Sequence, residues 1–410
     1  ILTVTDGITH TGWISRLIRC GLVLIFAVAA LELFVRLFVF PDWRDLSPQI
    51  LEPHPVFLRF SAPDLSARQY DPPNFDVLIE TNSLGFRDRR EGFEQDLAGL
   101  WLCGGSNVFG TGVNNDETMA SQIEKFGYRV ANLAAEGSQI EIETRVMRYL
   151  MREGFRPKAV ICAITTPGAI YDTVDKGWLQ QFDAPLPEAD AIAKPVAKIQ
   201  SAADRLWFAV NRVVPITEDG TAFSVLAAKA RLVKSSAIYG ALKYGVGEIP
   251  PLYDWLRQRG YIADSDLHIS GEADLYLKDL PEKQVVRLAN MGRFLVRLRD
   301  LVQERLGVPF GIVLVPTQHQ VYPARFTKYL AHNGLNPAAY DLALPNRRLA
   351  EILSASGIPS LDLRPPLLAR NDEALTFINN GHLNPRGQKV AAEYIAPWIA
   401  SALGVEAVKP

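Results

Sequence analysis

A serine flanked by glycines follows a short apolar run near residue 100, where residues 100–112 read LWLCGGSNVFGTG. An apolar run with turn residues behind it predicts a buried strand that ends in a tight loop. A helix pattern follows over Met119 to Phe126, with Asp116 or Thr118 as its N-cap. Because open α/β sheets bind their ligands at the carboxyl ends of the strands, Ser106 is a candidate nucleophile. An ordinary strand–helix turn is the alternative.

A second candidate, His382, is one of only six histidines in the chain. It lies in a polar loop, residues 377–387, which reads FINNGHLNPRG just before a predicted helix. A neutral imidazole can act as a general base for a nearby serine. Taken alone, a histidine at a helix start is more often a surface or capping residue than a catalyst.

Predicted strands and helices alternate on both sides of one long interruption. The strands cover 77–80, the apolar run that begins at residue 100, 128–133, 159–164, 310–315 and 360–363, and the helices 140–153, 282–306, 344–356 and 385–403. This alternation predicts an α/β fold, a three-layer sandwich whose mostly parallel sheet carries helices on both faces. Residues 173–278 interrupt it with helical composition over 192–213 and 222–244, which predicts a helical insertion.

One segment, Leu17 to Phe40, is long and apolar enough to cross a membrane as a helix. Arg16 and Arg19 precede it, which favours the amino end in the cytoplasm and the rest of the chain outside. A cleavable signal peptide usually has a shorter core, so we expect a retained transmembrane helix.

This span contains Glu32 and Arg36 at i,i+4 spacing on one helix face. Charged side chains inside a span usually pair with each other or face protein rather than lipid. Two interpretations stay open: the two residues pair with each other, or this face contacts another membrane-protein subunit.

Composition indicates which partners and cofactors the chain could bind. The 410 residues carry a net charge of −2, and no basic tract suggests a nucleic-acid partner. Of the three cysteines, Cys103 and Cys162 lie in apolar runs, which predicts buried thiols, and Cys20 lies beside the first apolar segment. No Cys/His spacing predicts a metal site. We expect no cofactor.

The two candidate stretches, in this order, resemble the SGNH (GDSL-like) hydrolase superfamily in its membrane-anchored bacterial form. The resemblance covers about residues 77–403 and is weakest in the insertion. The matching stretches are TNSLGFR at 81–87, GGS at 104–106, Gly137, PTQHQVYP at 316–323 and GHLNP at 381–385.

The resemblance implies that Ser106 attacks an acyl carbonyl and His382 takes its proton. It also implies that the backbone N–H groups of Ser106 and Gly137 hold the oxyanion. The chain departs from the family at three places. Gly105 replaces an aspartate, Gly168 to Asp172 lacks the oxyanion asparagine, and Asn380 stands where the family has the orienting aspartate.

An asparagine stabilises an imidazolium less than a carboxylate does, and it can select the wrong tautomer. A carboxylate from another loop could replace the missing acid. The candidates are Asp172, Asp362 and Asp372.

The predicted organisation follows from these segments. It comprises a cytoplasmic segment 1–16, a transmembrane helix 17–40, an extended connector 41–76, an SGNH hydrolase-like domain 77–403 with its insertion at about 173–278, and a tail 404–410. The resemblance places the chain in a bacterial inner membrane with its main domain periplasmic. Its function is then that of a catalytically impaired structural or accessory subunit of a membrane complex. The alternative is an active serine O-acyl esterase or acetyltransferase on cell-envelope carbohydrate or lipid.

Overall fold

The structure is a computed structural model that describes residues 10–39, 50–54, 56–88, 92–137, 140–172, 186, 236–267, 269 and 272–407. The chain divides into two units. The first contains residues 1–47 and 201–253, and the second contains residues 48–200 and 254–410. Both candidate residues, Ser106 and His382, belong to the second unit.

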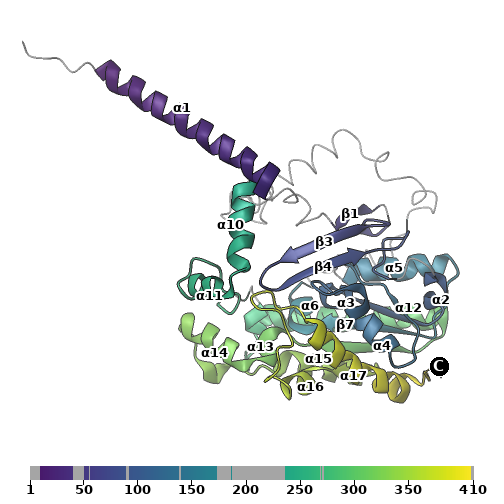
Figure 1. Ribbon diagram of the computed structural model, residues 1–410. Helices are drawn as coiled ribbons and strands as arrows, with labels where there is room; N and C mark the ends of the chain where they lie inside the picture. Colours follow the sequence, from purple (N-terminus) through teal and green to yellow (C-terminus); the bar gives the residue numbers. More distant parts are fainter. Residues whose placement is uncertain are drawn as a thin grey trace, which may run out of the picture. The chain divides into compact units, whose positions relative to one another are not determined.

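A five-stranded parallel sheet forms the centre of the second unit (Figure 1). Its strands are β5 (Leu100–Gly104), β6 (Val130–Asn132), β7 (Ala159–Thr165), β8 (Phe310–Val315) and β9 (Ser360–Asp362). They lie in the order β6-β5-β7-β8-β9. After β5 the chain adds β6 on one side of β5 and then β7, β8 and β9 on the other side, so the strand order reverses between β5 and β7. The predicted mixed α/β fold with a parallel sheet is confirmed. In such sheets the reversal opens a crevice at the carboxyl ends of the strands.

Helices cover both faces of this sheet because successive strand residues point to opposite sides. Trp101 and Cys103 belong to one buried cluster with residues of α5 (Ile140–Arg152), α12 (Glu282–Leu306) and α15 (Leu344–Ala355). Leu100 and Leu102 belong to another, with residues of α4 (Met119–Glu124) and α17 (Pro385–Leu403). Cys103 and Cys162 are free, buried thiols, as predicted.

Shorter elements complete the second unit. They are α2 (Phe93–Leu97), α3 (Ser106–Phe109), η2 (Asn115–Glu117), α6 (Thr166–Asp172), η5 (Glu272–Tyr276), α13 (Gln318–Val321), α14 (Pro323–His332), η6 (Pro337–Ala339) and α16 (Arg364–Leu368), and α11 (Pro250–Gln258) begins at the end of the first unit. The N-cap of α4 is Thr118, whose hydroxyl accepts a hydrogen bond from the Ser121 backbone N–H. This selects one of the two caps that the sequence left open.

The stretch predicted as an extended connector, 41–76, differs in the structure. Its described residues, together with the rest of β4, form two antiparallel hairpins. One pairs β1 (Leu51–His54) with β2 (Leu58–Ser61), and the other pairs β3 (Ser66–Asp71) with β4 (Phe75–Glu80). Phe57 and Phe60 pack into the buried cluster that contains Trp101. Among the described residues, Pro63 and Asp64 lie in the turn before β3, and Pro72 and Pro73 lie in the turn between β3 and β4, while Phe57 and Phe60 supply the packing.

The predicted helical insertion is described only in part. The expected helix at 192–213 lies outside the described residues, as does most of the one at 222–244. From residue 236 onward the structure shows α10 (Ala237–Gly247), which belongs to the first unit.

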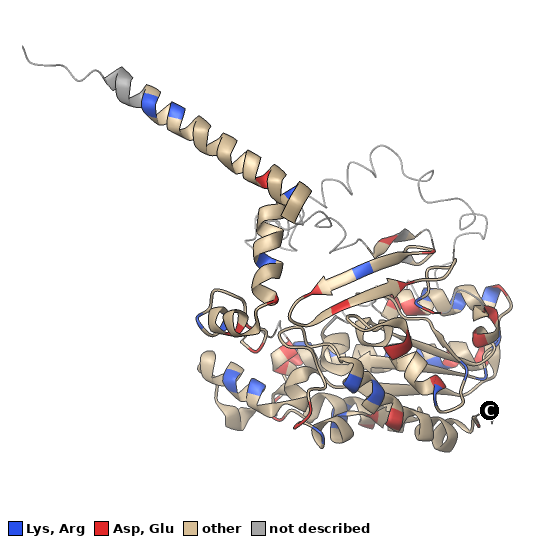
Figure 2. Cartoon of the chain, viewed as in Figure 1, with Lys and Arg blue, Asp and Glu red and all other residues tan. Residues whose placement is uncertain are grey.

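The first unit also contains α1 (His10–Phe34), continued by a π-helical turn, η1 (Val35–Val39). Residues Ser15–Val39 are long and apolar enough to be a membrane span or a signal sequence. Figure 2 shows α1 without charged residues over most of its length, with basic residues near its start.

Glu32 and Arg36 pair with each other, with 2.7 Å between Glu32 Oε1 and Arg36 Nε. The same carboxylate also accepts hydrogen bonds from the Ser236 hydroxyl at 2.9 Å and from the backbone N–H groups of Ala237 and Ile238 at 2.6 and 3.1 Å. These groups form the N-terminus of α10, where the helix dipole favours a negative charge. Glu32 therefore has its hydrogen-bond partners within the chain, and a contact of Glu32 and Arg36 with another subunit stays a prediction.

Residues 81–88 brace the loop that follows Ser106. Asn82 Oδ1 accepts from the backbone N–H groups of Leu84 and Phe86, and Asp88 Oδ2 accepts from that of Asn132 at the end of β6. Arg87 is buried and donates to the carbonyls of Phe109, Gly110 and Val113 and to Asn115 Oδ1. One guanidinium thus donates hydrogen bonds to the backbone carbonyls of the turn that follows α3.

Replacing Arg87 with methionine is expected to lower the free energy of unfolding by about 3 kcal/mol or more, because three buried carbonyls lose their donor. Chemical denaturation of the purified chain measures this. The control is Arg68→Met, which breaks the exposed pair with Asp76 and should change stability by less than about 1 kcal/mol. Equal losses in the two variants would contradict the bracing role of Arg87.

Candidate active site

Ser106 lies directly behind β5, at the first residue of α3. Gly104 is required there because a Cβ at this position would lie 2.4 Å from Val108 Cγ2 and 2.5 Å from the Ala163 carbonyl oxygen. At Gly104 the chain therefore packs closely against the Val108 side chain of α3 and the backbone of β7, and it turns from β5 into α3 across Gly105. The turn places Ser106 at the carboxyl edge of the sheet.

The structure brings Ser106 and His382 together from positions 276 residues apart. The distance from Ser106 Oγ to His382 Nε2 is 2.8 Å, and Asn380 Oδ1 contacts the other ring nitrogen, Nδ1. The His382 loop ends at the N-cap of α17, where Asn384 Oδ1 accepts from the Gly387 backbone N–H. Ser106, His382 and Asn380 thus form a continuous chain of side-chain contacts.

Asn107 joins the two halves of this site. Its Oδ1 accepts from the Leu383 backbone N–H at 2.9 Å, and its Nδ2 donates to Thr165 Oγ1 at 3.1 Å. Its carbonyl accepts from Gln388 Nε2 at 2.8 Å. Sequence analysis missed this residue, because an asparagine after a candidate nucleophile looks like any helix-start residue.

A cavity of about 320 Å³ opens over Ser106 and His382. Most of the residues in its wall have polar side chains, and the wall consists of Ser106, Asn107, Thr165, Ser265, Ile269, Glu272, Tyr276, Thr317, Gln318, His319, Asn380, Gly381 and His382. Its volume lies at the small end of the range of ligand pockets.

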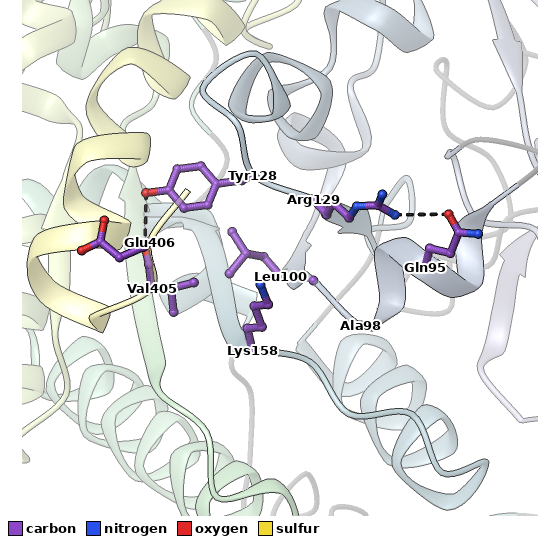
Figure 3. Close-up of a pocket in the computed structure, with 9 residues that line it drawn as sticks. Gln95, Ala98, Leu100, Tyr128, Arg129, Lys158, Val405 and Glu406 are labelled. Carbon is purple, nitrogen blue, oxygen red and sulfur yellow. Dashed lines mark hydrogen bonds between the residues drawn. The ribbon is translucent and has the colours of Figure 1, made fainter. Parts of the chain in front are cut away.

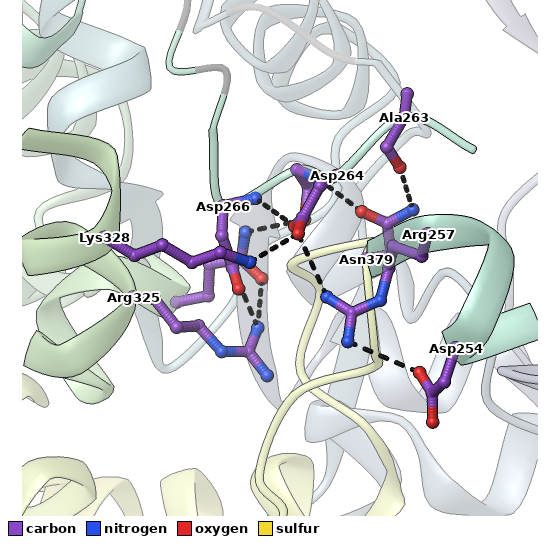
Figure 4. Close-up of polar contacts among 10 residues, drawn as sticks. Asp254, Arg257, Ala263, Asp264, Asp266, Arg325, Lys328 and Asn379 are labelled. Atoms are coloured by element: carbon purple, nitrogen blue, oxygen red, sulfur yellow. Dashed lines mark hydrogen bonds and ion pairs between the residues drawn. The ribbon is translucent and has the colours of Figure 1, made fainter. Parts of the chain in front are cut away.

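A network of charged residues holds one wall of this cavity (Figure 4). The Asp264 carboxylate accepts from Lys328 Nζ at 2.5 Å and from Arg257 Nη1 at 3.2 Å. Asn379, next to Asn380, donates to the Ala263 carbonyl and accepts from the Ser265 backbone N–H. The segment that carries Ser265 is therefore fastened to the His382 loop.

Burial lowers the pKa of His382 from 6.5 to about 4. Burial also lowers the pKa of His319 to about 4, and in the described part of the chain His319 Nε2 has no hydrogen-bond partner. Both imidazoles are therefore neutral at pH 7, the state in which His382 can accept a proton.

Acid is expected to destabilise the fold through these histidines. The unfolded chain takes up their protons below about pH 6.5, whereas the folded chain takes them up only near pH 4. The free energy of unfolding should therefore fall between these values, by up to about 1.4 kcal/mol per pH unit for each histidine. Urea denaturation across this range measures the slope. His319→Gln should make it shallower, and an unchanged slope would contradict the expectation.

The other predicted site residues do not join this cluster. Gly137 follows β6, its carbonyl accepts from Arg59 Nη2 at 2.6 Å, and it is not part of the cavity wall. Asp362 accepts from Asn346 and Arg364. In the described part of the chain, no hydrogen bond joins His382 to Asp172, Asp362 or Asp372. Gly168 to Asp172 lies within α6, so the end of β7 at Thr165 is what faces the cavity.

A second hollow, of about 350 Å³, lies at the opposite end of β5 (Figure 3). Leu100, Tyr128, Arg129, Lys158 and Glu406 contribute to its wall. It contains no serine, cysteine or histidine, so the nucleophile–base pair makes the Ser106 cavity the candidate active site. Across the described residues, no group of three or more His, Cys, Asp and Glu side chains could hold a metal ion.

Comparisons with known proteins assign no family. No family model matches the chain, and no curated protein matches it. One solved structure aligns with a TM-score of 0.34 and 13% sequence identity, over 75% of this chain and 98% of the matched chain. Similarity of this degree establishes neither a shared fold nor a function.

Proposed function

We propose that the protein is a serine-dependent acyl-ester hydrolase or acyltransferase, with Ser106 as nucleophile and His382 as general base. The observation that carries this proposal is the 2.8 Å contact between Ser106 Oγ and His382 Nε2 at the floor of an open cavity. The strand order and the two helical layers are compatible with an SGNH-like three-layer sandwich.

The reaction begins when Ser106 Oγ attacks the acyl carbonyl carbon and its proton moves to His382 Nε2. The bond to the leaving alcohol then breaks, and His382 returns the proton to that alcohol. Water or a second alcohol attacks the resulting acyl-serine, again with His382 as base, and restores the free serine. The backbone N–H of Ser106 would hold the oxyanion. Gly137, the second donor that the resemblance implied, is not part of the cavity wall.

The cavity favours a small acyl group on a polar alcohol. Thr317, Gln318, Glu272 and Ser265 offer hydrogen-bonding groups around Ser106, as sugar hydroxyls require. An acetyl ester of cell-envelope carbohydrate fits this chemistry, and a lipid ester is the alternative. A span within Ser15–Val39 would anchor the domain on the periplasmic side of a bacterial inner membrane.

Two observations favour a second function. Asn380 carries no charge to stabilise a protonated His382, and the pKa of His382 is only about 4. A catalytically impaired domain that serves as an accessory subunit of a membrane complex would show both features. The open cavity and the intact serine–histidine contact favour the enzyme over this alternative.

The experiment uses the full chain, purified in mild detergent, with 4-nitrophenyl acetate and an acetylated sugar as substrates. We expect turnover and a transient acetyl adduct by intact mass spectrometry, both abolished in Ser106→Ala. The matched control, Ser401→Ala, removes an exposed hydroxyl of α17 and should leave both unchanged. Absence of turnover, together with stoichiometric co-purification of other membrane proteins, would favour the accessory subunit.

A further inference from the structure

The direction of the Asn380 amide decides whether His382 can act as a base. An asparagine offers an acceptor oxygen on one side and a donor NH2 group on the other, and the hydrogen-bond network must establish which faces a given neighbour. If the NH2 group faced His382 Nδ1, that nitrogen would carry a lone pair. The proton would then lie on Nε2, and the ring could not accept the serine proton.

Asp71 contacts the other side of the same amide. Asn380 Nδ2 lies 3.5 Å from Asp71 Oδ2, which also accepts from Asn74 Nδ2 at 3.1 Å. A carboxylate accepts hydrogen bonds and donates none, so it selects the orientation in which the Asn380 NH2 group faces Asp71. The amide oxygen then faces His382.

This orientation determines the histidine tautomer. The Asn380 oxygen can only accept, so His382 Nδ1 must carry the proton and Nε2 must carry the lone pair. Nε2 is the atom that lies 2.8 Å from Ser106 Oγ. The hydroxyl can then donate its proton to the ring.

The position of Asp71 follows from the way the β3–β4 hairpin is attached. Gln69 Oε1 accepts from the Gly112 backbone N–H, in the turn behind α3, at 2.8 Å. The ring of Phe75 packs against that of Phe377, in the His382 loop, with centroids 5.1 Å apart. A Cβ on Gly112 would lie 2.5 Å from the Phe75 ring, so the hairpin packs closely on this turn. The hairpin thus contacts both loops of the site.

We propose that Asp71 is a positioning residue that orients the Asn380 amide and thereby holds His382 in the Nδ1–H tautomer that a general base requires. The proposal rests on the proposed function for its kinetic consequence, but the tautomer itself can be measured without any substrate. The sequence has no aspartate just before His382, and Asp71 on the hairpin would replace it by acting through Asn380.

The test measures the tautomer directly, by nitrogen NMR of the full chain labelled with 15N-histidine at pH 7, with the signals assigned through His382→Gln. Protonated and unprotonated ring nitrogens have well-separated shifts. In the unmodified protein we expect a protonated Nδ1. In Asp71→Lys, which offers only donors, the amide should reverse, and Nε2 should carry the proton. Asp71→Ala removes the preference, so the Nδ1–H population should fall at least about twofold.

Kinetics provide the second readout. In Asp71→Lys, kcat should fall by close to the factor of about four orders of magnitude that the wrong tautomer costs in serine proteases, and KM should change little. Asp71→Lys/Asn380→Asp should restore both the tautomer and most of kcat, since a carboxylate on Nδ1 only accepts. The matched control is Asp76→Asn, on the same hairpin but paired with the exposed Arg68, and it should change neither.

An unchanged Nδ1–H tautomer in both Asp71→Lys and Asp71→Ala would overturn the proposal, as would an Nε2–H tautomer in the unmodified protein. If Asp71→Lys lost activity but kept the Nδ1–H tautomer, and the double variant did not restore that activity, Asp71 would have only a structural role. A tautomer that responds to Asp71 in a protein that hydrolyses no ester would instead support the positioning role and contradict the proposed function.

Discussion

Replacing His382 with glutamine is expected to lower kcat for ester hydrolysis by about two to four orders of magnitude. Glutamine can still lie against Ser106, but its amide cannot take up the serine proton at neutral pH. KM should change little, because the imidazole acts on the proton that moves in the transition state. The matched control is His332→Gln, on the exposed end of α14, which should retain full activity.

The pH dependence of the same reaction tests the environment of His382. Because burial lowers its pKa to about 4, the neutral form should prevail at all higher pH values, and kcat/KM should stay flat from about pH 8 to pH 5. Activity should fall only as the pH approaches 4, where protonation removes the base. An inflection near pH 6.5 would mean that the ring is solvated rather than buried.

Local patterns placed Ser106 and His382 in loops, and the resemblance to SGNH hydrolases implied that the two residues act together. Apolar runs followed by turn residues predict strands and loops locally, and parallel strands place their carboxyl ends at one edge. The bounds of β8, α12 and α17 were predicted to the residue for the same reason, since their apolar periodicity is sustained and ends at clear breakers. Local patterns therefore located the elements that carry Ser106 and His382, whereas the pairing of the two residues came from the resemblance.

The parts that sequence analysis did not predict are contacts between distant segments. Asp71 lies in a stretch whose prolines and aspartates indicated a connector, and its relation to Asn380 exists only after the β3–β4 hairpin has packed on the loops. The contact of Glu32 with the N-terminus of α10 joins positions about 200 residues apart. No local pattern encodes either contact, because each depends on which surfaces meet.

The oxyanion site provides the second large effect, through Thr165. For the proposed hydrolase, the asparagine that SGNH enzymes use as an oxyanion donor has no counterpart in the sequence, and Thr165 at the end of β7 contributes to the cavity wall with Ser106. Its Oγ1 accepts from Asn107 Nδ2 at 3.1 Å, so its own hydrogen can be donated toward the cavity. A hydroxyl in this position can take the place of the missing amide as a donor to the developing negative charge.

Thr165→Val should therefore lower kcat by about two orders of magnitude with little change in KM, because the lost hydrogen bond forms mainly in the transition state. Thr165→Ser keeps the hydroxyl and should retain most of the activity. The matched control is Thr166→Val, which removes a buried hydroxyl that is not part of the cavity wall. Equal activities of the two valine variants would exclude Thr165 as a donor. A fall in thermal stability with a raised KM in Thr165→Val would instead indicate that Thr165 acts by holding Asn107.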